Sequence, residues 1–323
     1  MVMNEDYLVL LYYCYSRIED SEVFREQHHL RCLELNLKGR IIIAEEGLNG
    51  TVSGLRADCE QYMQDVKSDP RFADIEFKVD EASDHCFSKL HVRVKPEIVH
   101  ASLPNIDPTK KTGGYVEPDE FRKILQEQPE DTVILDVRSN YEHEVGKFKN
   151  AITLDLENFR DFPEKVKELE HLKSKKVITY CTGGIKCEKA SAYLLEQGFE
   201  DVHQLHGGII KYGLQADGED FEGKCYVFDN RIVKDLNKVN PKVISRCYVT
   251  GEPSDRMVNC ANPHCNMHIP MSEKGAEIYN GCCSEECSMH PDVRTYDGTG
   301  YYQKEMNGYN PYRGVKRKPE TVE

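Results

Sequence analysis

The sequence predicts a multidomain protein of mixed α/β and α+β architecture. Strand-like and helix-like patterns follow different orders in the first and second parts of the chain, and the cysteines of the last part are clustered. A chain of 323 residues is long enough for two or three domains. We expect a ferredoxin-like domain over residues 1–100, a linker over 101–114, an α/β domain over 115–215 and a cysteine-rich module over 216–323.

The first region has the pattern of a ferredoxin-like sandwich, with the order strand–helix–strand–strand–helix–strand. Its first segment, YLVLLYYCYS, is rich in strand-forming residues. Gly39 can end the first helix, Gly47 and Gly50 can form turns, and Pro70 stops the second helix. The last two segments alternate apolar and polar side chains, as half-buried strands do. We expect strands over residues 7–16, 40–46, 48–54, 74–83 and 88–99, and helices over 19–39 and 55–69.

The second region alternates strands with mostly helical segments, which predicts a parallel sheet covered by helices on both faces. It follows a linker that contains Pro104, Pro108 and the pair Gly113-Gly114. The third region lacks a clear helix or strand period, so we expect a small module without a large core, ending in a disordered tail. The expected strands of the second region are residues 132–137, 151–156, 176–181 and 202–206.

Composition excludes several classes of protein. The net charge of −14 argues against broad, non-specific nucleic-acid binding, although residues 85–114 and the tail sequence RGVKRKPE are locally basic. No apolar stretch is long enough for a membrane span, and the N-terminus lacks the basic start of a signal peptide, so we expect a cytoplasmic protein. Thirteen cysteines without a secretory signal favour thiol chemistry or metal binding over disulfides.

A cysteine at a strand-to-helix corner is the main chemical signal of the sequence. Cys181 follows the strand KVITY and begins the loop Thr182, Gly183, Gly184, Ile185 and Lys186. The glycines allow backbone N–H groups to face the sulfur, and the helix N-terminus and Lys186 add positive charge, so we expect a thiolate nucleophile. The alternative is a buried structural cysteine. A Cys-x5-Arg phosphatase is disfavoured, because Cys187 occupies the position that the arginine requires.

Several motifs resemble known families. LDVRSNYEHEVGKFKNAI (135–152), CTGGIK (181–186) and LHGGIIKYG (205–213) are similar to the rhodanese pattern, except that Lys147 and Lys149 stand where many rhodaneses have His and Pro. Together with IIIAEEGLNGTVSG, GKCYVFDNR and CYVTGEPSDRMVNCANPHC, they resemble the rhodanese-domain-containing tRNA uridine hydroxylase family over nearly the whole chain.

This resemblance implies an enzyme that hydroxylates the wobble uridine of tRNA at C5 to 5-hydroxyuridine, with molecular oxygen as co-substrate and Cys181 as functional residue. Cys181 would either add to C6 of the base or carry oxygen as a sulfenic or peroxidic species, with Cys187 as a resolving thiol or a packed residue. Asp136 and Arg138 would support the loop, Arg138 either by pairing with Glu142 or by an anion contact. The alternatives are a sulfurtransferase that carries persulfide on Cys181 and a non-catalytic binding module.

Two other features suit an RNA substrate. The turn AEEGLNG places Asn49 either in a left-handed conformation or against a base edge of a splayed anticodon loop. Lys89, Arg93 and Lys95 alternate along one expected strand, so they share a face and can follow phosphates. The sequence leaves open which tRNAs are substrates and what the oligomeric state is.

The cysteines of the third region have the spacing of a metal site. The pair Cys260 and Cys265 precedes the pair Cys283 and Cys287, which fits a tetrahedral thiolate site for a structural zinc ion. Unmetallated thiols are the alternative. Further candidate ligands are Cys247, Cys282, His264 and His268.

Overall fold

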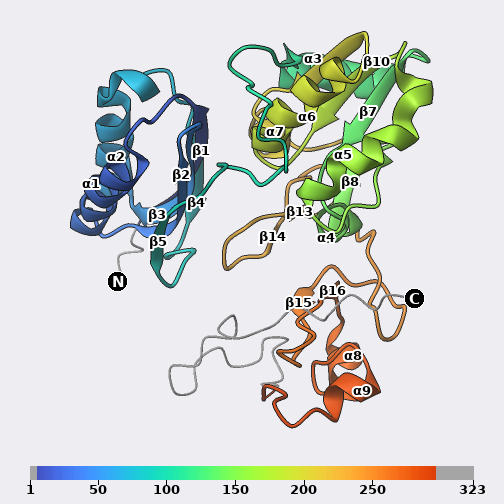
Figure 1. Ribbon diagram of the computed structural model, residues 1–323. Helices are drawn as coiled ribbons and strands as arrows, with labels where there is room; N and C mark the ends of the chain where they lie inside the picture. Colours follow the sequence, from blue (N-terminus) through green and yellow to red (C-terminus); the bar gives the residue numbers. More distant parts are fainter. Residues whose placement is uncertain (1–5, 296–323) are drawn as a thin grey trace.

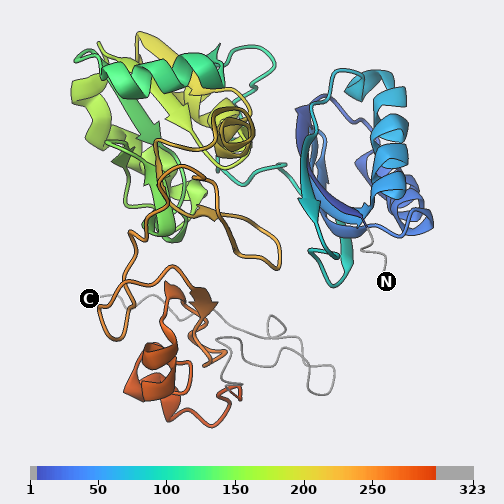
Figure 2. The same ribbon diagram turned by 180° about the vertical axis from the view of Figure 1, so that it is seen from behind.

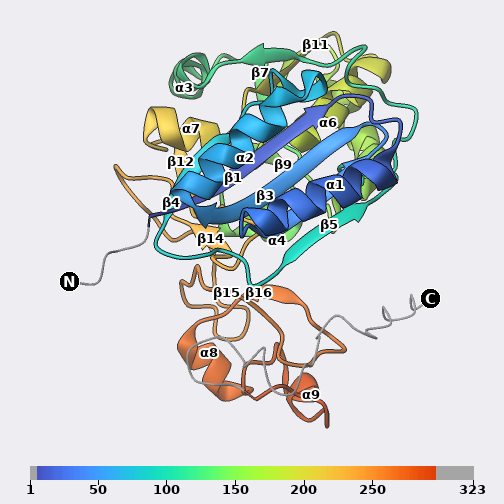
Figure 3. The ribbon, with the colours of Figure 1, turned by 90° about the vertical axis from the view of Figure 1, so that its left-hand side faces the viewer.

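The computed structural model describes residues 6–295, and its N-terminal domain (residues 7–94) is the expected ferredoxin-like sandwich. Helices α1 and α2 cover one face of its sheet, and the opposite face is turned toward the central domain (Figures 1 and 3). The strand order is β4-β1-β3-β2-β5, in which β5 adds a fifth strand parallel to β2. The elements are β1 Tyr7–Tyr15, α1 Ser21–Glu34, β2 Lys38–Ala44, β3 Gly47–Leu55, α2 Arg56–Ser68, β4 Lys78–Ala82 and β5 Leu90–Val94.

Three local predictions in this domain are wrong. Helix α1 ends at Glu34, before Gly39, because Asn36 already adopts a left-handed backbone with φ of 50°. Gly39 lies inside β2, where a Cβ atom would approach the Thr51 carbonyl oxygen to 2.3 Å. Gly50 and Asn49 lie inside β3 rather than in a turn, and Asn49 is not left-handed. A Cβ atom on Gly50 would meet the Tyr12 ring, so packing rather than turn geometry requires this glycine.

The central domain (residues 114–236) has the expected parallel sheet, in the order β6-β11-β10-β7-β9. Helices α5 and α6 pack a core against one face, and α3 and α7 pack a second core against the other (Figure 2). The strands are β6 Gly114–Val116, β7 Thr132–Asp136, β9 Ile152–Thr153, β10 Lys176–Tyr180 and β11 Asp201–Leu205. The helices are α3 Pro118–Glu127, α4 Asn140–Val145, α5 Phe162–Lys165, α6 Ile185–Glu196 and α7 Gly208–Ala216.

Only two of the residues expected as a strand over 151–156 are paired in β9. The chain leaves the sheet there because Asn140 bonds Leu156: the Asn140 backbone N–H donates to the Leu156 carbonyl at 2.8 Å, and the Leu156 N–H donates to Oδ1 of Asn140 at 3.0 Å.

The chain after α7 has two parts, which belong to different regions of the structure. Its first part, with β12 Phe221–Gly223, β13 Cys225–Tyr226 and β14 Val233–Lys234, packs on the central domain, where β12 pairs with β8 Gly146–Phe148. Its second part, the C-terminal module (residues 245–294), contains hairpin β15 Met257–Asn259 and β16 His268–Pro270, with α8 Glu273–Ile278 and α9 Glu285–Ser288. The predicted disordered tail and its basic sequence lie outside the described residues. Among residues 6–295 no helix is long and apolar enough to cross a membrane.

Candidate active site and metal centre

Cys181 lies where the sequence predicts it, directly after β10 and in the loop that leads into α6. Gly184 has a φ of 100°, and this left-handed backbone turns its N–H toward the sulfur, which accepts a hydrogen bond at 3.2 Å from the nitrogen. The side chain of Cys181 is almost fully buried. The loop therefore holds the sulfur in a nest of backbone dipoles at the carboxyl end of a central strand.

The surroundings of Cys181 favour its ionised form. Burial alone would raise the pKa of Cys181, but hydrogen bonds from the Cys187 thiol and from loop amides, with the Lys186 ammonium, lower it to about 7. Cys187 is buried in the first turn of α6, and burial together with the neighbouring Cys181 raises its pKa. The surroundings thus favour the thiolate form of Cys181 and the neutral thiol form of Cys187.

A second turn supports the loop from below. The backbone N–H of Ile209 donates to the Cys181 carbonyl, and that of Ile210 donates to the Thr182 carbonyl, each at 3.0 Å. Gly208 lies so close that a Cβ atom would approach the Cys181 carbonyl oxygen to 2.5 Å. The segment LHGGIIKYG (205–213) therefore packs directly against the active loop and holds its backbone through hydrogen bonds.

The charged residues next to the loop pair differently from the expectation. The predicted pair of Arg138 and Glu142 is wrong: the Arg138 guanidinium binds the Asp136 carboxylate, with nitrogen–oxygen distances of 2.9 and 2.7 Å. Its other hydrogen bonds go to the backbone carbonyls of Glu142 and Gly146. The buried Glu142 carboxylate instead pairs with Lys186. Asp136 and Arg138 therefore form a buried pair, and Glu142 orients the ammonium group of the loop.

The N-terminal domain covers the active loop, which the sequence did not predict. A Cβ atom on Gly183 would approach Leu11 of β1 to 2.9 Å, and one on Gly184 would approach the Tyr13 hydroxyl to 2.9 Å. Tyr13 donates to Glu188 in α6 at 2.9 Å, and Tyr15 donates to the Ile185 carbonyl at 3.4 Å. Alternation along β1 places these side chains on the sheet face opposite α1 and α2, so they close over the thiol.

The AEEGLNG segment helps to hold the two domains together. Glu46 and Glu97 each contact the buried Lys189 ammonium of α6 at 2.8 Å. Glu46 also accepts the Ile98 N–H at 2.7 Å, and the Asn49 amide donates to the Ile98 carbonyl at 2.9 Å. In this conformation Asn49 positions the chain that leaves β5.

A cavity of about 360 Å³ lies between the N-terminal and central domains. Its walls include Tyr13 and Tyr15 of β1, Tyr115 of β6, Glu188 of α6 and Lys78 of β4. Glu188 accepts hydrogen bonds from the Tyr13 and Tyr115 hydroxyls, both at 2.9 Å. No local sequence signal marks these lining residues, because they are far apart in the chain and only domain packing brings them together.

The expected basic face is present on β5. Lys89, Arg93 and Lys95 are exposed and alternate with the half-buried Leu90, Val92 and Val94, which face the helices. His91 lies on the exposed face between them, and Arg40 of β2 is its neighbour in the sheet. The register of the sheet places this basic face on the same side as Tyr13, which contacts the active loop. The basic face comprises Arg40, Lys89, His91, Arg93 and Lys95.

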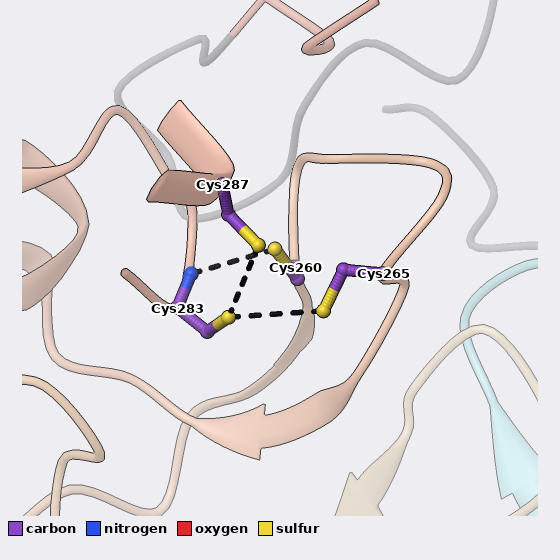
Figure 4. Close-up of side chains that lie close together, drawn as sticks. All are labelled: Cys260, Cys265, Cys283 and Cys287. Carbon is purple, nitrogen blue, oxygen red and sulfur yellow. Dashed lines mark hydrogen bonds between the residues drawn. The ribbon is translucent and has the colours of Figure 1, made fainter. Parts of the chain in front are cut away.

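The four predicted zinc ligands converge in the C-terminal module (Figure 4). Their sulfur atoms all lie within 4.8 Å of one another, and Cys283 Sγ is 3.7 Å from that of Cys265 and 3.6 Å from that of Cys287. Four thiolates around zinc at about 2.3 Å would be about 3.8 Å apart, so the cluster fits a tetrahedral metal site. Of the other candidates, Cys247 and Cys282 lie outside the cluster, and His264 groups with His290 and Asp292.

Comparison with known families agrees with this architecture. Residues 7–98 match the UPF0176 acylphosphatase-like domain, residues 117–214 match the rhodanese-like domain, and residues 222–288 match the rhodanese C-terminal family. The rhodanese match includes Cys181 with its whole loop, and the C-terminal match includes all four clustered cysteines.

Proteins with a shared name align with nearly the whole chain. A tRNA uridine(34) hydroxylase from Cytophaga hutchinsonii is 67% identical, and the alignment covers 97% of this chain and 100% of that protein. Proteins of the same name from Bacillus licheniformis and Listeria welshimeri are 48% and 49% identical, and each alignment covers 90% of the relative and 90% or 88% of this chain, respectively.

Proposed function

The chain belongs to the tRNA uridine(34) hydroxylase family, and we propose that it hydroxylates uridine 34 of tRNA at C5 to give 5-hydroxyuridine, with molecular oxygen as co-substrate. Cys181 is the functional residue of this proposal. The observation that carries the assignment is the buried sulfur of a glycine-rich loop, whose pKa the loop lowers to about 7 and which a second domain covers. Because the substrate is tRNA, we place the reaction in the cytoplasm.

The electronic requirements of the reaction suggest a role for the pair of thiols. Addition of the Cys181 thiolate to C6 of uracil would make C5 nucleophilic toward oxygen. Replacing the C5 hydrogen by hydroxyl removes two electrons from the base, whereas reduction of O2 to one hydroxyl and one water takes four. The Cys181 thiolate and the Cys187 thiol can supply the other two electrons and one proton by forming a disulfide, water supplies the second proton, and an external thiol then reduces the disulfide.

Incubation of the purified protein with unmodified tRNA under oxygen tests the main proposal. We expect mass spectrometry to find one added oxygen at nucleotide 34, and no product from Cys181→Ser or without oxygen. A parallel assay offers thiosulfate and cyanide and measures thiocyanate. Thiocyanate production without any change in the tRNA would support the sulfurtransferase alternative and contradict the hydroxylase.

Cys187 variants test the thiol pair separately. Without an external thiol, we expect Cys187→Ser to form no product even in a single turnover, because serine keeps a hydrogen-bond donor but cannot supply two electrons by forming the disulfide. In the wild type, peptide mapping after turnover without added thiol should find the Cys181–Cys187 disulfide. Sustained turnover by Cys187→Ser would exclude Cys187 as the electron source.

We also propose that the basic face follows the phosphates of the anticodon arm. Its exposed cations lie on the side of the sheet that covers the active loop, so phosphates bound to them would bring the neighbouring nucleotides of the RNA close to Cys181. Arg93→Ala and Lys95→Ala should each weaken tRNA binding and lower the salt dependence by about one counterion. Lys123→Ala, on exposed α3, is the control and should bind normally.

For the C-terminal module we propose one structural zinc ion bound by Cys260, Cys265, Cys283 and Cys287. Four thiolates leave no coordination position for substrate, so the ion would stabilise the fold and take no part in the reaction. Metal analysis of protein purified without chelator should find about one zinc ion per chain. A metal-free protein with an equally stable module would contradict the proposal.

A further inference from the structure

The cavity between the two domains has walls suited to a planar base. Tyr13, Tyr15 and Tyr115 line it, and the carboxylate of Glu188 fixes two of these rings through their hydroxyl groups. Single-stranded bases in protein complexes are commonly stacked on aromatic side chains. The volume of about 360 Å³ lies within the usual range for small-ligand sites.

Lys78 supplies the cavity with an unused hydrogen-bond donor. Its side chain is 4% exposed, and its ammonium stands 5.0 Å from the centroid of the Tyr13 ring. The nearest carboxylate is that of Glu76 at 3.9 Å, which already contacts Lys211 at 3.0 Å and His206 at 3.5 Å. Within residues 6–295 no acceptor lies at hydrogen-bond distance from the Lys78 ammonium. Lys78 Nζ is not among the fully buried unpartnered atoms of the described residues, so it is open to the cavity, where a ligand carbonyl would give it an acceptor.

The charges around the cavity select for a neutral ligand. Asp74, Glu76 and Glu188 line it together with Lys78, so a phosphate group would meet like charge. Uracil instead offers carbonyl oxygens to an ammonium and an N–H group to a carboxylate or phenol oxygen. The phosphates of the same nucleotide would remain outside, toward the basic face.

The cavity also adjoins the active loop. Tyr13 lines the cavity on one side, and on the other its hydroxyl lies against Gly184 and Glu188 at the start of α6. Burial lowers the pKa of Lys78, and the negative charges of Glu76 and Cys181 oppose this shift, so Lys78 lies within electrostatic reach of the thiolate. One tyrosine ring therefore separates a ligand in the cavity from the loop that holds the thiol.

We propose that this cavity receives the uracil of nucleotide 34, turned out of its stack, and that Lys78 donates a hydrogen bond to one of its carbonyl oxygens. The inference rests on the proposed tRNA substrate and adds a binding residue on the N-terminal domain. Contact between the base and Cys181 then requires the Tyr13 ring to shift. This gives the N-terminal domain a direct part in substrate binding, beyond covering the loop.

Photo-crosslinking tests the location without relying on turnover. A tRNA that carries 5-bromouridine at position 34 is irradiated with the wild-type protein, and the linked peptide is identified by mass spectrometry. We expect a peptide that contains Tyr13, Tyr15 or Tyr115. A crosslink confined to another surface, such as β5 or the C-terminal module, would overturn the inference.

Kinetics of Lys78 variants test the donor. Lys78→Met should lower kcat/KM about ten- to a hundredfold, because it removes a charged hydrogen bond. Lys78→Arg should recover part of this loss, and Lys211→Met, which disturbs the same Glu76 carboxylate but removes no cavity donor, should stay near wild type. An unchanged thermal unfolding midpoint would show that Lys78→Met is folded.

The two proposals fail in different ways. If wild-type protein leaves uridine 34 unmodified, the proposed function is wrong. If the wild type is active and Lys78→Met is equally active, only the cavity assignment is wrong.

Discussion

The central domain and the C-terminal module both depend on cysteine, but they use sulfur in opposite ways. In the central domain, Cys181 and Cys187 lie in an apolar core, and hydrogen bonds with one ammonium group decide which thiol is ionised. In the C-terminal module, four cysteines face one another, with small apolar clusters around them. In the central domain the hydrogen bonds and the ammonium group, not the core itself, favour the thiolate, whereas in the C-terminal module the close approach of four sulfur atoms suits a metal ion.

The difference follows from how much apolar surface each region buries. The central domain has a core on each face of its sheet, with aromatic and aliphatic side chains from several helices. The C-terminal module has short strands and helices of at most six residues. Segments this short bury too little surface to fold on the hydrophobic effect alone, so a metal would have to supply much of the stability.

The largest expected effect, loss of hydroxylation by about a thousandfold or more, comes from Cys181→Ser. Since serine fills nearly the same volume, thermal unfolding of the central domain should shift little. Mass spectrometry of the tRNA product checks the loss of hydroxylation, and a melting curve checks that the stability is unchanged. Substantial residual hydroxylation would remove Cys181 from the chemistry.

Cys283→Ser should destabilise the C-terminal module but leave the Cys181 thiol unchanged, because it removes one of the four proposed zinc ligands and leaves the active loop intact. We expect loss of zinc and rapid proteolysis within residues 245–294, while the alkylation rate of Cys181 stays unchanged. Cys247→Ser is the matched control, because Cys247 is buried in the same module but lies in a different apolar cluster, outside the four converging cysteines. Equal zinc content in both variants would contradict the ligand assignment.

Lys186→Met should raise the pKa of Cys181 above its value of about 7, because the variant removes the ammonium that favours the thiolate. In wild type the rate of iodoacetamide alkylation should fall as pH decreases through about 7, and in the variant this fall should begin at higher pH. A rise of one pKa unit would slow alkylation at pH 7 by about fivefold. Lys186→Arg keeps the charge and should behave nearly as wild type.

The smallest effect is expected for Cys187→Ala compared with Cys187→Ser. The Cys187 thiol donates to Cys181 and helps to lower its pKa, so alanine should raise the alkylation midpoint and serine should largely preserve it. Identical midpoints in the two variants would mean that backbone amides and Lys186 alone ionise Cys181.

Much of the fold could be predicted because its signals are local. Strand alternation in β1 and β5, the glycine corner at Gly183 and Gly184, and the spacing of the clustered cysteines all depend on neighbours in the chain. Predictions failed where a distant partner decided the outcome. Gly39 and Gly50 are explained by packing against β3 and Tyr12. The pairing of Arg138 is an exception, because its partner Asp136 is only two residues away in the sequence.

The sequence by itself determined the parallel and antiparallel sheets, the position of Cys181 at the strand-to-helix corner and the four converging cysteines. These follow from backbone periodicity and short spacings, which the covalent chain imposes on any folded form. Only the tertiary structure decided that Tyr13 covers the loop, that Lys189 joins the two domains and that Lys78 faces a cavity. Those contacts join residues far apart in sequence, and their geometry is set by how whole domains pack against one another.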